Sequence, residues 1–467
     1  MSEPKTPQDP SNIIMTDLYQ SAEKIYIRRI KGYFRNLRFF GGVFLFAAYF
    51  GTLWLNWGDR QAVLFDLPKR QFHIFGITFW PHDFILLSWA LIISAFALFF
   101  ITVFAGRIWC GYTCPQSVFT WVFMFIEEKT EGKRNARIKL DQQPMSLVKI
   151  LRKAAKHLLW ILVALVTAIT FVGYFFPIRE LLPDLAQLST GGWVIFWIAF
   201  FTLATYGNAG WLREQVCIYM CPYARFQSVM FDRDTLIVSY DAARGESRGA
   251  RSRDADPAEL GLGDCIDCDL CVQVCPTGID IRDGLQYECI GCAACVDACD
   301  SVMEKMGYDS GLVRYTTENS LEGTKSSLLR PRLIGYAAAL MVMMIAFTVV
   351  LYSRVPIELD IIRDRGALHK MTTDGLIQNS YLLKIANMTE QVQTFVISVD
   401  GIPGLVFRST QRIQVPGGDA VTVPTLLVLP ADLNRLPTTK IYFSINGEEN
   451  PKLATTEESR FFGPANF

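Results

Sequence analysis

Eight cysteines in the middle of the chain repeat one spacing, and this spacing predicts iron–sulfur chemistry. Two C-x2-C-x2-C-x3-C runs follow one another, the first ending in Cys-Pro and the second in Cys-Asp. Such runs bind paired [4Fe–4S] clusters, and the fourth cysteine of each run binds the other cluster. The predicted ligands are Cys265, Cys268, Cys271 and Cys299 for the first cluster, and Cys289, Cys292, Cys295 and Cys275 for the second. Two zinc ribbons or a disulfide framework are the alternatives, but zinc would need only four ligands per site with wider gaps between pairs.

The other four cysteines form a C-x3-C-P motif that occurs twice. The copies are Cys110, Cys114 and Pro115, and then Cys217, Cys221 and Pro222, 107 residues further on. Because residues four apart on a helix share one face, each motif is expected to present two thiols to one ligand, and the two motifs could converge. Soft thiolates favour Cu(I), with zinc and Fe–S as rivals. A reversible dithiol/disulfide pair and buried apolar cysteines are the other interpretations.

Membrane helices are the elements that must position these motifs. Five apolar stretches have about the ~20 residues needed to cross a bilayer. They are residues 39–57, 84–104, 158–176, 193–207 and 333–351. Each C-x3-C-P motif follows an apolar stretch and precedes an aromatic, amphipathic segment, so the sequence predicts a duplicated unit.

Basic residues alternate along the connections between these stretches. Lys and Arg number seven up to residue 38, three in 59–82, ten in 106–157 and one in 177–192. By the positive-inside rule, the N-terminus, the 106–157 segment and the cysteine module are expected in the cytoplasm, and the chain after residue 351 outside. All twelve cysteines fall on the expected cytoplasmic side, which suits thiolate ligands. The formal net charge is zero, so the chain as a whole gives a nucleic-acid partner no electrostatic support.

Two weaker signals leave their alternatives open. Four histidines, His73, His82, His157 and His369, could include a haem pair but are more often surface or interfacial residues. The arginine-rich segment 239–253 could bind anionic lipid, organise docking of the cluster module or serve as a solvated linker.

The last part of the chain changes to short strands separated by turns. Predicted strands cover residues 380–385, 393–399, 425–429 and 440–445, with Gly- and Pro-containing breaks between them. Strands at this spacing favour an immunoglobulin-like β-sandwich. We expect a partner-binding or orienting module, or one that only caps the last helix.

The predicted fold is therefore an α-helical membrane bundle of about five spans, with an inserted 2[4Fe–4S] ferredoxin-like module and a C-terminal immunoglobulin-like β-sandwich. The expected segments are a cytoplasmic tail (1–38), four spans with the duplicated motif (39–232), a linker and cluster module (233–330), a fifth span (331–353) and an external sandwich (354–467).

This combination resembles the FixG/RdxA/CcoG family of bacterial cytochrome c oxidase accessory proteins. The resemblance also covers the Tyr240–Glu246 stretch and the segment from Asn379 to Thr389. It implies a multi-pass protein of the bacterial inner membrane, with a periplasmic C-terminal domain.

The resemblance further implies reduction of Cu(II) to Cu(I) for assembly of a cbb-type haem–copper oxidase. Cys110, Cys114, Cys217 and Cys221 would then be the copper site, and the eight module cysteines would hold the electron relay. The implied partners are a copper carrier or oxidase assembly factors and an unidentified electron donor, and a homodimer is an option. The alternatives are a quinol-linked conduit to a respiratory reductase, as in NapH- and NosR-like proteins, and a non-enzymatic redox scaffold or sensor.

Overall fold

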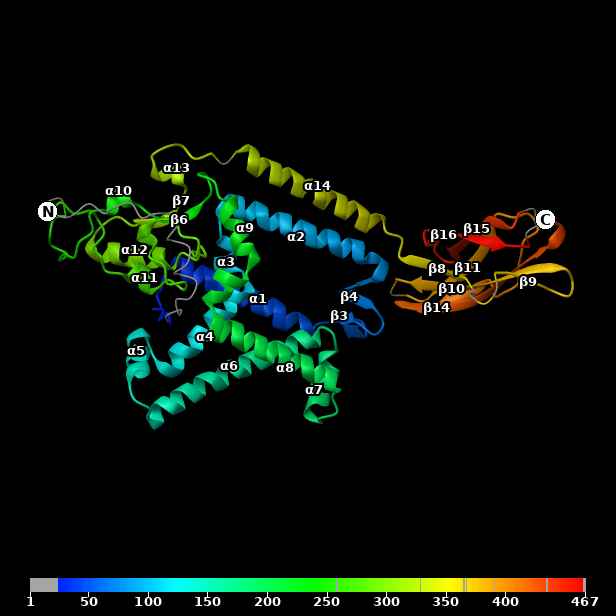
Figure 1. The fold of residues 1–467 in the computed structure, drawn as a ribbon, viewed down its shortest axis with the longest axis horizontal. Coiled ribbons are helices and arrows are strands. Elements are labelled where there is room, and N and C mark those ends of the chain that lie inside the picture. The colour runs from blue at the N-terminus through cyan, green and yellow to red at the C-terminus, as the bar shows by residue number, and fades with distance from the viewer. Residues whose placement is uncertain are drawn as a thin grey trace, which may run out of the picture. The chain divides into compact units, whose positions relative to one another are not determined.

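A computed structural model gives the arrangement of the chain (Figure 1). It describes residues 24–257, 259–327, 329–363, 366, 368–389, 391–433 and 436–464. The first 23 residues of the expected cytoplasmic tail lie outside this range.

Five helices among the described residues are long and apolar enough to cross a membrane, which confirms the five predicted spans. They are α1 (Tyr33–Gly51), α2 (Phe84–Ala105), α6 (Leu147–Gly173), α8 (Gly192–Tyr206) and α14 (Pro331–Ser353). A π-helical segment, Gly207–Leu212, extends α8. The protein is a multi-pass membrane protein.

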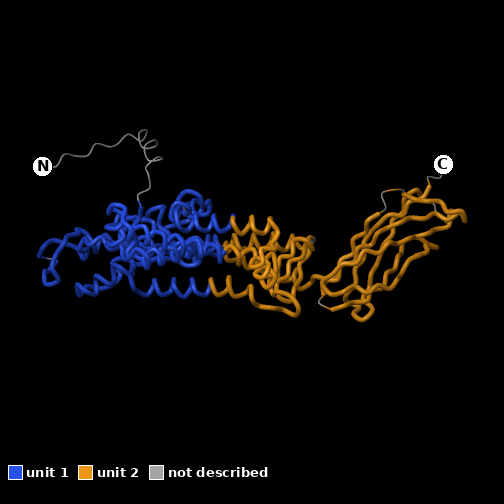
Figure 2. Tube along the Cα trace, turned by 90° about the horizontal axis from the view of Figure 1, so that it is seen from below, with its two compact units in different colours: residues 1–45, 98–167, 200–334 blue, residues 46–97, 168–199, 335–467 orange. Residues whose placement is uncertain are grey.

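The chain forms two compact units, coloured separately in Figure 2. The first contains residues 1–45, 98–167 and 200–334, and the second contains residues 46–97, 168–199 and 335–467. The first unit holds the N-terminal ends of α1, α6 and α14 and the C-terminal ends of α2 and α8. Successive spans therefore alternate in direction.

Shorter helices surround the cysteines of the first unit. After α2 come α3 (Ile108–Tyr112), α4 (Pro115–Glu131) and α5 (Arg134–Gln142), and after α8 come a π-helical turn (Val216–Met220) and α9 (Pro222–Met230). The cluster module contains β6 (Ile237–Tyr240), α10 (Ala242–Gly245), α11 (Leu270–Gln273), α12 (Ala294–Met306), β7 (Val313–Thr316) and α13 (Glu318–Leu321). Antiparallel pairing of β6 with β7 closes the module at its two ends.

The second unit includes small sheets between α1 and α2 that the sequence analysis missed. They consist of β1 (Asn56–Trp57), β2 (Arg60–Gln61), β3 (Val63–Asp66), β4 (Gln71–Ile74) and β5 (Ile77–Phe79). These strands are two to four residues long, too short for a period-two pattern to show clearly. The helix α7 (Ile178–Ala186) follows α6 in this unit.

The C-terminal domain is a β-sandwich, as predicted. One sheet has the order β12-β14-β10-β8 with β9 on β10, and the other has the order β13-β11-β15-β16. The strands are β8 (Ile357–Arg363), β9 (Lys370–Met371), β10 (Leu376–Asn387), β11 (Gln393–Asp400), β12 (Val406–Phe407), β13 (Arg412–Val415), β14 (Asp419–Pro430), β15 (Thr438–Gly447) and β16 (Ala454–Phe462). Alternate residues of β11 and β15, such as Phe395, Ile397, Phe443 and Ile445, are buried in the core between the sheets.

A buried ion pair ties the sandwich to the loop that precedes α2. Arg354, just after α14, pairs with Asp83 at 2.5 Å, and Asp83 also accepts a hydrogen bond from the Trp80 backbone at 2.9 Å. Gln71 Nε2 donates to the Gly418 carbonyl at 2.8 Å. These contacts hold the sandwich to the loop segment 59–83 of the same unit at more than one point.

Candidate functional site

The eight module cysteines lie on two segments, each containing a loop and the helix that follows it. In the first run, Cys271 lies on α11, whereas the loop tip at Cys268 is exposed. In the second run, Cys295 and Cys299 both lie on α12. The first three cysteines of each run therefore lie on a short stretch of chain that ends in a helix.

One cavity of the module is lined by five of these cysteines. They are Cys271, Cys275, Cys289, Cys292 and Cys295. A cubane iron–sulfur cluster is held by four thiolates, and the cavity offers at least that number, so these residues fit the group. Cys299 has Cys271 and Cys265 as electrostatic neighbours, and Cys271 has Cys268. The assignment of individual cysteines to each cluster stays a prediction.

Arginines of the segment 239–253 fold onto the first cysteine loop. Arg251 donates to the Cys265 carbonyl at 3.3 Å and to the Gly263 carbonyl at 2.7 Å. Arg244 pairs with Asp264 at 2.5 Å. The segment is thus packed against the module and supports the backbone around the first cysteine.

A carboxylate of the module caps the first membrane helix. Asp297, on α12 between two cluster cysteines, accepts hydrogen bonds from the backbone N–H groups of Phe34 at 3.1 Å and Arg35 at 2.7 Å. The first N–H groups of a helix have no partner within it, and a carboxylate satisfies them and favours the positive end of the helix dipole. Because of this cap, α1 begins at Tyr33, before its apolar stretch.

We expect the substitution Asp297→Ala to weaken the attachment of the module to α1. Loss of a capping side chain costs about 0.5–2 kcal/mol of stability. Thermal loss of the cluster absorbance in detergent measures the effect. The control is Glu304→Ala, an exposed position on the same helix, for which we expect a change within about 0.5 kcal/mol. If both variants lose the cluster absorbance at the same temperature, Asp297 does not have this capping role.

The C-x3-C-P motifs differ from the prediction in their local structure. Cys110 lies on the five-residue helix α3, which ends at Tyr112, and Cys114 is extended and precedes α4. The second copy is alike, with Cys217 on a π-helical turn and Cys221 extended before α9. The prediction that both cysteines share one helix face is therefore wrong. The residue before a proline avoids the helical region, so the helix breaks between the two cysteines.

The structure nevertheless brings the four thiols of the two motifs into one region. Cys110 has Cys114, Cys217 and Cys221 as electrostatic neighbours. Burial raises the pKa of the Cys110 thiol to about 12 and that of Cys217 to about 11, and the buried Arg107 opposes both shifts. Among the residues that the structure describes, no group of three His, Cys, Asp or Glu side chains is arranged so that it could bind a single metal ion.

The two repeats hold each other reciprocally through equivalent positions. Gln116, the second residue after Cys114, donates to the backbone carbonyls of Asn208 at 2.9 Å and Arg213 at 3.2 Å in the second repeat. The equivalent residue of the second repeat, Tyr223, donates to the Leu98 carbonyl of the first repeat at 3.1 Å. The duplicated unit is thus an interlocked pair.

The first motif packs directly on the second cluster loop. A Cβ added at Gly111 would lie 2.8 Å from the Cα of Cys292 and 2.9 Å from the carbonyl oxygen of Gly291. Tyr315 donates to the same carbonyl at 2.6 Å and lies 3.1 Å from the Tyr112 hydroxyl. Only glycine permits this approach of the two backbones.

The second motif also reaches this loop. Tyr287 donates to the Ile218 carbonyl at 3.2 Å, and the Arg107 guanidinium lies 5.0 Å from the Tyr287 ring centre. Arg107 is an electrostatic neighbour of Cys110, Cys217 and Cys289. One buried cation therefore acts on thiols of both motifs and of the module.

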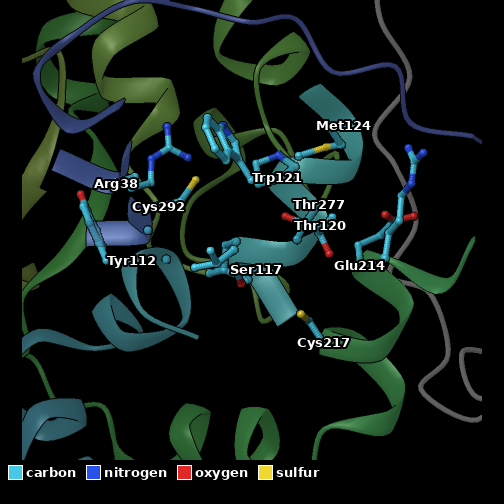
Figure 3. Close-up of a pocket in the computed structure, with 16 residues that line it drawn as sticks. Arg38, Tyr112, Ser117, Thr120, Trp121, Met124, Glu214, Cys217, Thr277 and Cys292 are labelled. Carbon is cyan, nitrogen blue, oxygen red and sulfur yellow. The ribbon is translucent and has the colours of Figure 1, made fainter. Parts of the chain in front are cut away.

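A cavity of about 70 Å³ lies between the thiol motifs and the module (Figure 3). Cys217 and Cys292 both line it, together with Met124 and Glu214. Sequence analysis did not identify Met124 or Glu214, because a single methionine or glutamate in an amphipathic segment carries no motif. Their proximity to two cysteines depends on the tertiary fold.

The histidines form no cluster in the described residues. His73 is buried, and its Nδ1 lies 2.9 Å from the Thr78 hydroxyl. Burial lowers the pKa of His73 to about 4. The Nδ1 of His157 lies 3.0 Å from the Tyr206 hydroxyl. These two side chains thus have structural hydrogen bonds.

Models of three protein families match the chain. A 4Fe–4S dicluster domain matches residues 212–318, a 4Fe–4S binding domain matches residues 87–130, and the immunoglobulin-like fold at the C-terminus of FixG matches residues 347–464. The second match contains Cys110 and Cys114 and no other cysteine. The chain binds iron–sulfur clusters.

Characterised relatives match most of the chain. The nitrogen fixation protein FixG of Rhizobium meliloti is 36% identical over 84% of this chain and 82% of its own length. Protein RdxA of Cereibacter sphaeroides is 38% identical over 87% of both chains. A crystal structure of a FixG-related protein from Vibrio parahaemolyticus is 32% identical, covers 23% of this chain and 95% of its own, and gives a TM-score of 0.22. With its five spans, its two cysteine runs and its sandwich, the chain belongs to the FixG/RdxA family of membrane iron–sulfur electron-transfer proteins.

Proposed function

We propose that this protein reduces Cu(II) to Cu(I) at the C-x3-C-P thiols, for assembly of a cbb-type haem–copper oxidase. The observation that carries the proposal is the small cavity lined by both Cys217 of the second motif and Cys292 of the module. A copper carrier or an oxidase assembly factor would receive the product.

The side chains around this cavity suit Cu(I). Thiolate and thioether ligands favour this soft ion, and the lining supplies the thiol of Cys217 and the thioether of Met124. The other three motif thiols lie nearby. Cys114 and Cys221 are electrostatic neighbours of Cys217, and Cys110 is an electrostatic neighbour of all three. The thiols are not arranged as a preformed site, so we propose that they close around copper when it arrives and release it afterwards.

The size of the cavity favours a metal ion over an organic substrate. About 70 Å³ accommodates a few water molecules or an ion with part of its shell. Pockets for organic ligands of drug size are ~300–1,000 Å³. A quinol ring would therefore need the walls of this cavity to move apart.

The module cysteines would hold the iron–sulfur clusters that supply the electrons in this proposal. We assign Cys265, Cys268, Cys271 and Cys299 to one [4Fe–4S] cluster, and Cys289, Cys292, Cys295 and Cys275 to the other, on the basis of their spacing. When bound, such clusters accept and release single electrons, and reduction of Cu(II) to Cu(I) consumes one. Gly111 and Tyr315 keep the first thiol motif against the Cys292 loop, so the acceptor stays beside its donor.

We also propose the bacterial inner membrane as the location, with the module in the cytoplasm and the sandwich in the periplasm. The distribution of Lys and Arg among the connections supports this orientation, and no cysteine follows Cys299. A cysteine introduced at the exposed Glu458 should react with an impermeant thiol reagent added to cells with a permeabilised outer membrane. If this cysteine is not labelled, the sandwich lies on the cytoplasmic side and the proposed orientation is wrong.

The test is copper reduction by the anaerobically purified, prereduced protein. We expect Cu(I), trapped with bicinchoninate, to form as the cluster absorbance reoxidises, one copper ion per electron. The double variant Cys110→Ser/Cys114→Ser should lose reduction while it keeps its iron. Met124→Leu should slow reduction, whereas Met341→Leu, an exposed methionine on α14, should not.

A second candidate is a quinol-linked electron conduit. A 4Fe–4S binding domain model matches residues 87–130, which contain Cys110 and Cys114, and this supports an iron–sulfur role for these thiols rather than a copper one. If quinol reduces the clusters and Cu(II) does not reoxidise them, this candidate is established and copper reduction is excluded.

A further inference from the structure

The two cluster loops share one backbone geometry. In each loop, the residues before and after the middle cysteine have positive φ angles. These residues are Asp267 and Asp269 (both 53°) around Cys268, and Gly291 (64°) and Ala293 (55°) around Cys292. Left-handed conformations at non-glycine residues are uncommon, so their repetition identifies Cys268 and Cys292 as equivalent loop tips.

The surroundings of the two tips differ. Cys292 is 8% exposed, and its loop packs on Gly111 and on the Arg107 backbone. Cys268 is exposed, and the side chains of its neighbours Asp267 and Asp269 are 51% and 60% exposed. One tip therefore faces the thiol motifs, and its counterpart faces solvent.

The exposed tip carries negative charge. Arg282 donates to Asp267 at 2.7 Å, to Asp269 at 2.7 Å and to Asp280 at 2.6 Å. Three carboxylates share this guanidinium, and Arg248 is a further electrostatic neighbour of Asp280, so negative charge is still in excess. The Arg282 side chain is only 7% exposed, so the carboxylates form the outer surface around Cys268.

We propose that the loop tip at Cys268 is the docking surface of a one-electron carrier protein whose contact surface is positively charged. The reduced carrier would pass one electron to the [4Fe–4S] cluster that Cys268 is assigned to hold, so the carrier is oxidised by one electron and the cluster is reduced by one. No proton moves and no bond changes, and the oxidised carrier leaves. Docking itself depends only on cluster binding, whereas the direction of transfer, from Cys268 towards Cys292, rests on the proposed copper reduction.

A basic cavity in the same unit offers the opposite charge and is the rival surface. It measures about 590 Å³, and its lining includes Arg28, Arg29, Lys31, Lys133 and Arg134. An acidic carrier would suit it. No cluster cysteine lines this cavity, whereas Cys268 itself is exposed, so the observations favour the acidic tip.

The test measures electron exchange and binding without copper. The full chain with its clusters, in phosphatidylcholine nanodiscs, is prereduced and mixed with cytochrome c, a basic one-electron haem protein, or with the trianion tris(oxalato)cobaltate. We expect cytochrome c to react faster, with a rate that falls as salt is added. Calorimetric binding of cytochrome c to the oxidised protein should show the same salt dependence.

Charge-removing variants locate the surface. Asp267→Asn and Asp269→Asn should each slow the reaction with cytochrome c about two- to fivefold and weaken its binding, because one favourable charge is lost. Asparagine tolerates positive φ and can still accept from Arg282, so the loop should keep its shape. As a control, Glu458→Gln on β16 should leave both the rate and the binding unchanged.

Three results would overturn the proposal. They are a rate indifferent to salt, wild-type rates in both asparagine variants with intact iron content, and a faster reaction with the trianion that Lys133→Gln slows. The last would place docking at the basic cavity. Since copper takes no part, failure of the copper assay would leave this result unaffected.

Discussion

The substitution Glu127→Gln is expected to destabilise the first unit by about 3–5 kcal/mol, the cost of removing one partner from a buried ion network. Glu127 is fully buried on α4. Its carboxylate lies 3.1 Å from Arg137 and 3.0 Å from Arg213, with Lys24 at 3.5 Å and Lys156 at 3.8 Å. These cations come from α5, the second repeat, the N-terminal segment and α6, so one carboxylate joins four parts of the unit.

The neighbouring glutamate provides a matched control. Glu128 is 22% exposed and pairs with Arg29 at 3.6 Å. Exposed pairs contribute about 0–1 kcal/mol, so Glu128→Gln should leave the melting temperature nearly unchanged. For Glu127→Gln, a fall of roughly 6–20 °C is expected in a detergent melt. Similar melting of the two variants would show that the buried network does not hold the unit together.

The same carboxylate predicts a dependence on pH. Burial favours the neutral acid, but Arg213, Lys24 and Arg137 outweigh it and hold the pKa of Glu127 below its ordinary value. A group with a lowered folded pKa stabilises the protein above its unfolded pKa, and this contribution is lost as pH falls through the folded value. Glu127→Gln should therefore lose part of the acid sensitivity of the wild-type melt.

The sequence predicted those features that repeat or follow a period. The cysteine runs, the five apolar stretches and the alternating strands of the sandwich all have spacings set by local geometry. The duplicated C-x3-C-P motif belongs to the same class. It was found by its constant offset, although the proline breaks the helix on which both thiols were expected.

Contacts between distant segments could not be predicted in this way. Asp297 caps α1 across 263 residues, and nothing near Asp297 in the sequence marks it as a cap. The cations that surround Glu127 come from four separate segments, and no motif in the sequence connects them. Met124 became a candidate ligand only because the fold places it on a cavity with Cys217.

The substitution Gly111→Ala is expected to separate the thiol motif from the cluster module. The new Cβ would meet the Cα of Cys292 at 2.8 Å and its backbone nitrogen at 3.0 Å. Backbone atoms cannot move aside as a flexible side chain can, so the two segments must shift apart, at a cost of about 1–3 kcal/mol. Electron transfer slows steeply with distance. Copper reduction by the prereduced protein should therefore fall several-fold while iron content stays constant.

A glycine elsewhere in the chain separates this effect from a general effect of alanine. Gly335, on the membrane helix α14, has nothing within 4 Å of an added Cβ. Gly335→Ala should leave the rate unchanged and should stabilise the helix by about 0.5–1 kcal/mol. The electron paramagnetic resonance spectrum gives a readout independent of copper, because displacement of the Cys292 loop should alter one cluster signal in Gly111→Ala alone. Unaltered spectra and equal rates in the two variants would mean that close approach at Gly111 does not control transfer to the thiols.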